Sequence, residues 1–376
     1  MEMHSDTSKP TSSSDATSGT PATHAPSGRR RARGFGLPLP GRPGPLNAIT
    51  DVAGVRVGQT TLAMPEQGIL TGVTALLPRP PEALLEPIWA GAFSMNGNGE
   101  MTGVHWIHEA GWFTGPITLT NTLSLGIAHH ATARWMCRTF GPVIGEDLWV
   151  LPVVAETYDG YLNDISGFHV TEAHVQAAID GAKGGPVAEG SVGGGAGMIC
   201  YEYKGGTGTA SRIATTPTGD FTVGALVQAN HGVRPWLTIC GRRLGDTLTD
   251  SLLWSRERGS IIVVLATDAP LLPTQMQRLA KRAAIGIGRG GTPSGNNSGD
   301  IFLAFTTANS PGRLPEPPRL TLEALSNDDL DPLFLAAVES VEEAVLKAML
   351  AADPVTGKHG RHVAALDGAR VAELVG

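Results

Sequence analysis

Hydrophobic residues along this chain fall into short runs separated by glycine, proline and polar residues, starting near residue 46. Several runs are rich in β-branched and aromatic residues, which is the pattern of strands. These predicted strands lie at 72–78, 115–122, 148–156, 198–205, 221–232 and 234–240. Two further runs, at 261–265 and 301–305, are apolar without interruption, which predicts strands buried on both faces.

Helical patterns lie among the strands. The predicted helices lie at 124–140, 171–185, 274–287 and 331–352. In the last of these one face carries only apolar residues, namely Phe334, Val338, Val341, Val345 and Met349. Mixed strands and helices with buried strand cores predict a layered α/β sandwich. No repeat and no linker follow residue 48, so we expect a single domain over residues 34–376.

Composition changes the picture mainly at the amino-terminal end. Residues 1–33 are almost all small, polar or charged, which predicts a disordered tail because such a segment buries too little apolar surface. The arginine-rich run at 29–33 is not followed by an apolar segment, so we expect no export and a cytoplasmic protein. The formal net charge of −7 argues against nucleic acid as a partner, and no apolar run is long enough to span a membrane.

One dipeptide stands at a chemically suggestive place. Gly259 and Ser260 lie directly before the buried strand at 261–265 and after the polar run at 255–258. Taken alone, a Gly-Ser pair is ordinarily a turn. A serine that becomes an amino terminus, however, gains an α-amine with an unperturbed pKa of about 8, which is able to take the proton of its own hydroxyl.

The segment RERGSIIVVLATDAPLLP around this dipeptide resembles the start of the small chain in the DmpA family. That family comprises the L-aminopeptidase/D-esterase group and the β-peptidyl aminopeptidases. The resemblance runs from about residue 46 to 310. Other blocks that carry it are LNAITDVAGVRVG, GVTALLPR, NGNGEMTGVHWI, GPITLTNT, LPVVAETYDGYLND, GPVAEGSVGGGAGMICYEYKGG, VQANHGVRPWLTICG and RAAIGIGRGGTPSGNNSGDIFLAF.

The resemblance implies a four-layer αββα sandwich of the Ntn-hydrolase-like, ornithine-acetyltransferase type, where periodicity alone indicates only α/β. It also implies self-cleavage between Gly259 and Ser260, giving a large chain of residues 1–259 and a small chain of residues 260–376. Ser260 would then be the catalytic nucleophile. Glycine before the serine suits this reaction because it lacks a Cβ, so the hydroxyl has room to reach the preceding carbonyl carbon.

The resemblance also suggests partners for Ser260. Asn230 would donate to the oxyanion, unless it only ends a strand in a turn. Tyr158 would assist the oxyanion or hold the leaving group, or is simply a half-buried aromatic. Ser298 and Asp300 would orient the Ser260 amine, or form an Asx-type turn; Asp300 stands where we expect glutamate in the β-peptidyl branch, so its contact is one methylene shorter.

An aminopeptidase must also bind an ammonium group, which a fixed carboxylate does best. Glu156 is the leading candidate, ahead of Glu100 and Asp159. No metal or nucleotide motif stands out, so we expect no cofactor. The implied function is release of N-terminal residues from short peptides, amides or esters, extending to D- or β-amino acids, by an oligomer of four αβ pairs.

Two alternative functions stay open at this point. The first is an acyltransferase of the ornithine-acetyltransferase type, against which the serine argues because those enzymes use threonine. The second is a non-catalytic ligand-binding homologue, which would remain a single chain.

Overall fold

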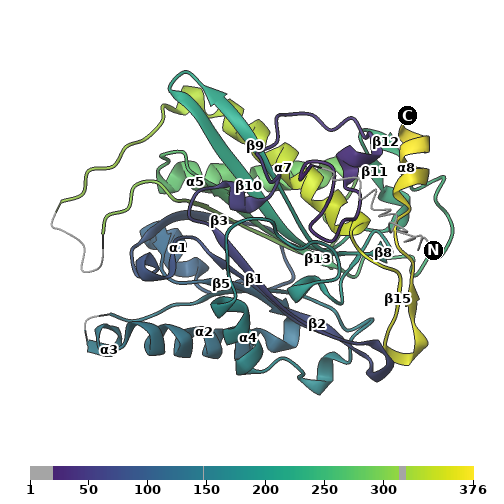
Figure 1. Ribbon diagram of the computed structural model, residues 1–376, viewed down its shortest axis with the longest axis horizontal. Coiled ribbons are helices and arrows are strands. Elements are labelled where there is room, and N and C mark those ends of the chain that lie inside the picture. Colours follow the sequence, from purple (N-terminus) through teal and green to yellow (C-terminus); the bar gives the residue numbers. More distant parts are fainter. Residues whose placement is uncertain (1–19, 147, 313–318) are drawn as a thin grey trace, which may run out of the picture.

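The computed structural model describes residues 20–146, 148–312 and 319–376, and two facing sheets form its centre (Figure 1). The smaller sheet has four strands in the order β1-β2-β5-β6. These strands are β1 (Arg56–Met64), β2 (Ile69–Leu77), β5 (Ile117–Asn121) and β6 (Val153–Thr157). β5 and β6 run parallel, whereas the other neighbours in this sheet are antiparallel.

The larger sheet has six strands in the order β4-β3-β14-β13-β10-β9. Its strands are β3 (Ile88–Gly97), β4 (Trp112–Phe113), β9 (Gly206–Thr216), β10 (Gly219–Asn230), β13 (Ser260–Thr267) and β14 (Gly299–Thr306). The central pair, β13 and β14, is parallel and flanked by antiparallel neighbours. The two strands predicted to be buried therefore lie side by side at the centre of the larger sheet.

Helices cover the outer face of each sheet. α2 (Leu125–Phe140) and α4 (Glu172–Asp180) pack on the smaller sheet. α5 (Pro273–Ala280), α6 (Arg282–Arg289) and α7 (Asp331–Leu350) pack on the larger one. Figure 1 shows the resulting order of helices, sheet, sheet and helices. The predicted αββα sandwich is confirmed.

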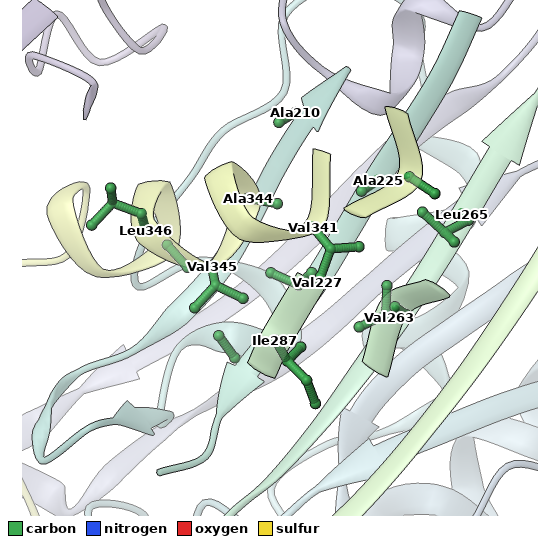
Figure 2. Packing of buried hydrophobic residues seen from close by; sticks show 14 of the residues in the cluster. Ala210, Ala225, Val227, Val263, Leu265, Ile287, Val341, Ala344, Val345 and Leu346 are labelled. Atoms are coloured by element: carbon green, nitrogen blue, oxygen red, sulfur yellow. The ribbon is translucent and has the colours of Figure 1, made fainter. Parts of the chain in front are cut away.

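The side chains of β13 show why its sequence is apolar at every position. Ile262, Val264 and Ala266 point into the core between the two sheets. The alternate residues, including Val263 and Leu265, point instead toward α6 and α7, where Figure 2 shows them among Val227, Ile287 and Val341. A strand buried on both faces has no position left for a polar residue, except at its ends.

The remaining α-helices and strands are short. They are α1 (Val104–Ala110), α3 (Val143–Glu146), α8 (Gly368–Val375) and the hairpins β7–β8 (Ile199–Cys200, Tyr203–Lys204), β11–β12 (Thr238–Ile239, Arg242–Arg243) and β15–β16 (Val355–Thr356, His362–Val363). Among the described helices, none has the length and apolar character needed to cross a membrane.

Two predictions about helices need correction. The single helix predicted at 274–287 is two helices, α5 and α6, separated by Lys281, and the two halves pack on different elements: α5 on β3 and α6 on α7. The helix predicted at 331–352 is α7, but it is buried nearly all round instead of along one face.

Part of the segment that we predicted to be a tail packs against the polar side of α7. Residues 1–19 lie outside the described part of the chain, but residues 20–33 pack against the domain, so the disorder predicted for them is wrong. Arg31 forms a two-pronged ion pair with Glu189, with N···O distances of 3.0 Å, and Lys347 on α7 joins it at 2.9 Å. Composition missed this because the segment is anchored largely by buried ion pairs.

Candidate active site

The predicted cleavage point lies where β13 begins, beside the end of its antiparallel neighbour β10. Ser260 is the first residue of β13, Asn230 is the last residue of β10, and the two are paired directly in register. Side chains alternate along a strand, so Ser260 shares the face of Ile262, toward the smaller sheet. Ser260 is only 5% exposed.

Gly259 passes very close to the neighbouring backbone. A Cβ at this position would lie 1.6 Å from the carbonyl oxygen of Asn230, so no residue with a side chain fits without movement of the strands. The segment before it is fixed by Glu257, whose carboxylate accepts hydrogen bonds from the backbone N–H groups of Gly232 at 2.6 Å and Gly295 at 2.7 Å. The requirement for glycine is therefore set by packing as well as by the geometry of the reaction.

A cleft with two adjoining cavities opens at this junction. The first, of about 510 Å³, is lined by Ser260, Glu156 and Tyr158, together with Glu100 and Thr122. The second, of about 250 Å³, contains Asn230 and shares Tyr158, Arg258 and Gly259 with the first. Four of the six predicted catalytic and binding side chains line this cleft, namely those of Ser260, Asn230, Tyr158 and Glu156.

Asn230 is held rigidly by both ends of its amide. Its Oδ1 accepts a hydrogen bond from the backbone N–H of Ile199 at 2.8 Å, and its Nδ2 donates to the carbonyl of Tyr158 at 2.9 Å. Because a side-chain amide has two N–H donors, one remains for a ligand in the cleft. A fixed donor of this kind needs little reorganisation when negative charge develops beside it.

Glu156 is a buried carboxylate in the first cavity. It lies on β6, accepts a hydrogen bond from the backbone N–H of Glu100 at 2.9 Å and a second from the hydroxyl of Thr122. Burial raises the pKa of Glu156, although these two hydrogen bonds oppose the shift. Asp159, a weaker candidate for the same task, is buried away from both cavities, and burial raises its pKa to about 7.

Tyr158 follows β6 directly and is 49% exposed at the boundary of the two cavities. A Cβ on Gly160 would lie 2.4 Å from its hydroxyl oxygen, so Gly160 leaves the space in which the phenol ring lies. The alternative reading of Tyr158 as a half-buried core aromatic does not describe this position, because its ring borders the cleft.

Ser298 and Asp300 lie behind the nucleophile and not in the cleft. Asp300 is paired with Ile261 on the neighbouring strand, and both Ser298 and Asp300 are fully buried. Ser298 donates to Oδ1 of Asp300 at 2.7 Å, and Ser294 donates to the other carboxylate oxygen. By strand alternation Asp300 shares the face of Phe302, opposite to the face of the Ser260 side chain.

Sequence reasoning missed His231, a buried residue that interacts electrostatically with Asp300. Its ring is 1% exposed and lies 5.2 Å from the ring of Tyr201, edge to face, while its Nε2 has no hydrogen-bond partner among the described residues. Burial lowers the pKa of His231 to about 4, against the opposing effect of the Asp300 charge. The only sequence signal was its place directly after Asn230. Glu257 was also missed, although it lies two residues before Gly259.

The arrangement is suited to acyl transfer. It brings together a hydroxyl at a potential amino terminus, a fixed amide donor and a buried carboxylate, which are the groups that attack a carbonyl, stabilise its oxyanion and bind an ammonium. Within the described residues, no group of three His, Cys, Asp or Glu side chains is placed to hold a metal ion.

Comparison with known proteins gives the same picture. Residues 47–363 match peptidase family S58. The β-peptidyl aminopeptidase BapA of Sphingosinicella microcystinivorans is 47% identical over 352 residues, which is 88% of this chain and 88% of that protein. A second BapA, from Sphingosinicella xenopeptidilytica, is 42% identical over 361 residues, or 89% of this chain and 88% of that protein.

Solved structures agree. The L-aminopeptidase D-Ala-esterase/amidase of Ochrobactrum anthropi, described as a prototype serine aminopeptidase and a new variant of the Ntn-hydrolase fold, superposes with a TM-score of 0.88 at 52% identity. A β-aminopeptidase from a Burkholderia species gives 0.86 at 47% identity, and each comparison covers 92% of this chain and 98% of the other. The resemblance noted from the sequence is confirmed: the protein is a hydrolase of the aminopeptidase class with an Ntn-hydrolase fold, and the chain belongs to peptidase family S58.

Proposed function

We propose that the chain cuts its own Gly259–Ser260 bond and that the freed Ser260 then releases N-terminal residues from short peptides, amides and esters. The observation that carries this proposal is the junction itself. Its glycine is required because a Cβ there would lie 1.6 Å from the carbonyl oxygen of Asn230. Its serine lines a cleft that is also lined by Asn230, Tyr158 and Glu156.

Self-cleavage starts with attack of the Ser260 Oγ on the carbonyl carbon of Gly259. The C–N bond breaks, the acyl group passes to Oγ, and the nitrogen leaves as the free amine of Ser260. Water then hydrolyses the ester, which gives a carboxylate on Gly259 and restores the serine hydroxyl. The approach of the chain to the junction is fixed by Glu257, which favours a reactive geometry over a mobile one.

Turnover uses the same hydroxyl. The amine of Ser260 takes the proton of Oγ as the hydroxyl attacks the substrate carbonyl, and later gives it to the leaving amine. The free N–H of Asn230 stabilises the oxyanion, and the hydroxyl of Tyr158 assists at the boundary of the cavities. We assign to the hydrogen-bonded pair Ser298 and Asp300 the orientation of the amine from the opposite face of β13, since Asp300 is paired with Ile261.

Glu156 binds the substrate's ammonium group in the first cavity, which selects substrates with a free amino terminus. Its two hydrogen bonds fix both carboxylate oxygens in place. The relatives named for β-peptides and for D-Ala esters support a stereochemical range that extends to D- or β-amino acids. The family membership disfavours the acyltransferase alternative, and the full set of polar groups around Ser260 disfavours a non-catalytic binder.

The variants Ser260→Ala and Asn230→Ala test this proposal, with L-Ala, D-Ala and β-homoalanine p-nitroanilides as substrates. Ser260→Ala removes the nucleophile of both reactions, so we expect one intact chain and no hydrolysis. Asn230→Ala is expected to fold and to lose roughly 10²- to 10³-fold in kcat, because it removes one oxyanion donor. If Ser260→Ala protein were cut and active, another residue would be the nucleophile.

We also propose that the processed protein is a cytoplasmic oligomer of four αβ pairs. The assembly is carried over from the family resemblance and the compartment from the sequence. Light scattering on the purified protein measures the assembly directly, and a mass corresponding to a single αβ pair would contradict it.

A further inference from the structure

The two cavities of the cleft differ in charge. The first is lined by two carboxylates, Glu100 and Glu156, and it shares Arg258 with the second. The second is lined by Arg258 and Arg361, and none of the described residues in its wall is acidic. A molecule that lies across both cavities therefore meets negative charge at one end and positive charge at the other.

Arg361 is a positioned cation in the second cavity. Its guanidinium lies 4.9 Å from the centre of the Tyr161 ring and donates to the carbonyl of Tyr161 at 3.1 Å. It forms no ion pair with any acidic residue in the described part of the chain, whereas the nearby Lys358 is paired with Asp164 at 2.7 Å. A guanidinium held in a cavity and left unpaired is suited to an anionic ligand.

Trp254 forms part of the wall of the same cavity. Its ring meets that of Tyr161 edge to face, with centres 5.1 Å apart, and its Nε1 is enclosed without an acceptor among the described residues. The segment that carries Trp254 is fixed by the buried carboxylate of Glu202, which accepts from the backbone N–H groups of Leu253 and Trp254. The wall of this cavity is thus built from anchored residues, not from freely moving side chains.

We propose that the second cavity is a leaving-group subsite in which Arg361 binds the terminal carboxylate of the substrate, so that the enzyme favours dipeptides with a free carboxyl end. This inference rests on the proposed function. With the ammonium at Glu156 and the scissile carbonyl between Ser260 and Asn230, the departing residue extends into the cavity of Arg361 and Arg258. A zwitterionic dipeptide matches the charge of the cleft at both ends.

The proposal separates substrates by the chemistry of the leaving group alone. A dipeptide and its C-terminal carboxamide have the same ammonium, the same scissile bond and nearly the same size, but only the dipeptide carries the carboxylate. A charge-assisted hydrogen bond of this type is expected to favour the dipeptide by about 10- to 100-fold in kcat/KM. A p-nitroanilide has no carboxylate and reports hydrolysis without this contact.

The test compares L-Ala-L-Ala, L-Ala-L-Ala-amide and L-Ala-p-nitroanilide with the processed enzyme. Its readout is the ratio of kcat/KM for the dipeptide to that for the amide. Arg361→Gln should reduce this ratio to near one. Arg361→Lys keeps the positive charge but loses the paired N–H donors of the guanidinium, so it should leave an intermediate ratio. Arg242→Gln is the matched control, because Arg242 is exposed on the β11–β12 hairpin, away from the cleft, and should keep the wild-type ratio.

Equal kcat/KM for the dipeptide and its amide in the wild-type enzyme overturns the subsite, and so does a ratio that survives in Arg361→Gln. These outcomes leave the proposed function intact as long as the p-nitroanilide is hydrolysed. Absence of hydrolysis of all three substrates by processed enzyme would instead contradict the proposed function. The wild-type comparison needs no variant, so it decides the matter even if Arg361→Gln does not fold.

Discussion

At the scale of single residues, the close packing of Gly259 against the backbone of Asn230 predicts the effect of adding a methyl group there. Gly259→Ala adds a methyl group 1.6 Å from a backbone oxygen, so the junction must shift away from its reactive geometry. We expect conversion of precursor to processed chains to slow by roughly tenfold or more, since relief of such overpacking costs about 1–3 kcal/mol. Densitometry of denaturing gels during expression measures the rate.

The control for that substitution is Gly126→Ala. Gly126 lies in α2, and a Cβ there would meet no atom within 4 Å. This variant should mature at the wild-type rate. If Gly259→Ala matured equally fast, the close approach would have no bearing on the reaction.

The buried carboxyl of Glu156 predicts how substrate binding depends on pH. Burial raises its pKa, and the carboxylate is the form that binds ammonium. As pH falls, Glu156 therefore becomes protonated at a higher pH than an ordinary glutamate, and KM should begin to rise there while kcat changes less. Glu156→Gln should have a KM about 10- to 100-fold higher, without this pH-dependent rise. A wild-type KM that stays constant down to the titration of an ordinary glutamate would contradict the assignment.

At the scale of elements, α7 depends on the segment that precedes the first strand. Arg31 is 3% exposed and binds Glu189, which also holds Lys347 of α7. Arg31→Ala removes one of the two cations that pair with the buried Glu189 and leaves that carboxylate with Lys347 alone. We therefore expect the free energy of unfolding to fall by about 3 kcal/mol. Urea unfolding in the uncut Ser260→Ala background measures this without dissociation of two chains.

Arg29→Ala is the comparison for Arg31→Ala. Arg29 forms an exposed ion pair with Asp353, and exposed pairs contribute at most about 1 kcal/mol. Equal losses of stability in the two variants would show that residues 20–33 do not anchor α7.

The same elements show what the sequence could and could not predict. The strands at 261–265 and 301–305 were predictable because burial on both faces leaves an unbroken apolar run. The cover on α7 was not predictable, because its signal is a set of ion pairs between residues more than 150 positions apart, such as Arg31 with Glu189. Composition indicates how much apolar surface a segment is able to bury, but it does not reveal such pairs.

The residues of the cleft also differ in whether the sequence could predict them. Ser260, Asn230, Tyr158 and Glu156 were found because they lie in sequence blocks that resemble a known family, and they meet in one cleft. Arg361 lies 101 residues after Ser260 and carries no local pattern. Only the fold brings it to the same cleft, so its position could not be read from spacing or periodicity.

At the scale of the whole molecule, the larger sheet is built from both sides of the proposed cut. β3, β4, β9 and β10 precede Gly259, whereas β13 and β14 follow it, and β13 is hydrogen-bonded to β10 along its full length. Separation of the two chains would break the central sheet and expose its core. We therefore expect the processed chains to stay together under native conditions and to separate only in denaturant.

The mass of the polypeptides in active, purified enzyme tests the central claim most directly. Under denaturing conditions, mass spectrometry should find two chains that divide between Gly259 and Ser260, and the smaller should begin Ser-Ile-Ile-Val-Val. The Ser260→Ala protein, prepared in the same way, should give one intact mass and no activity. A fully active wild-type enzyme that consists of a single uncut chain would contradict the account.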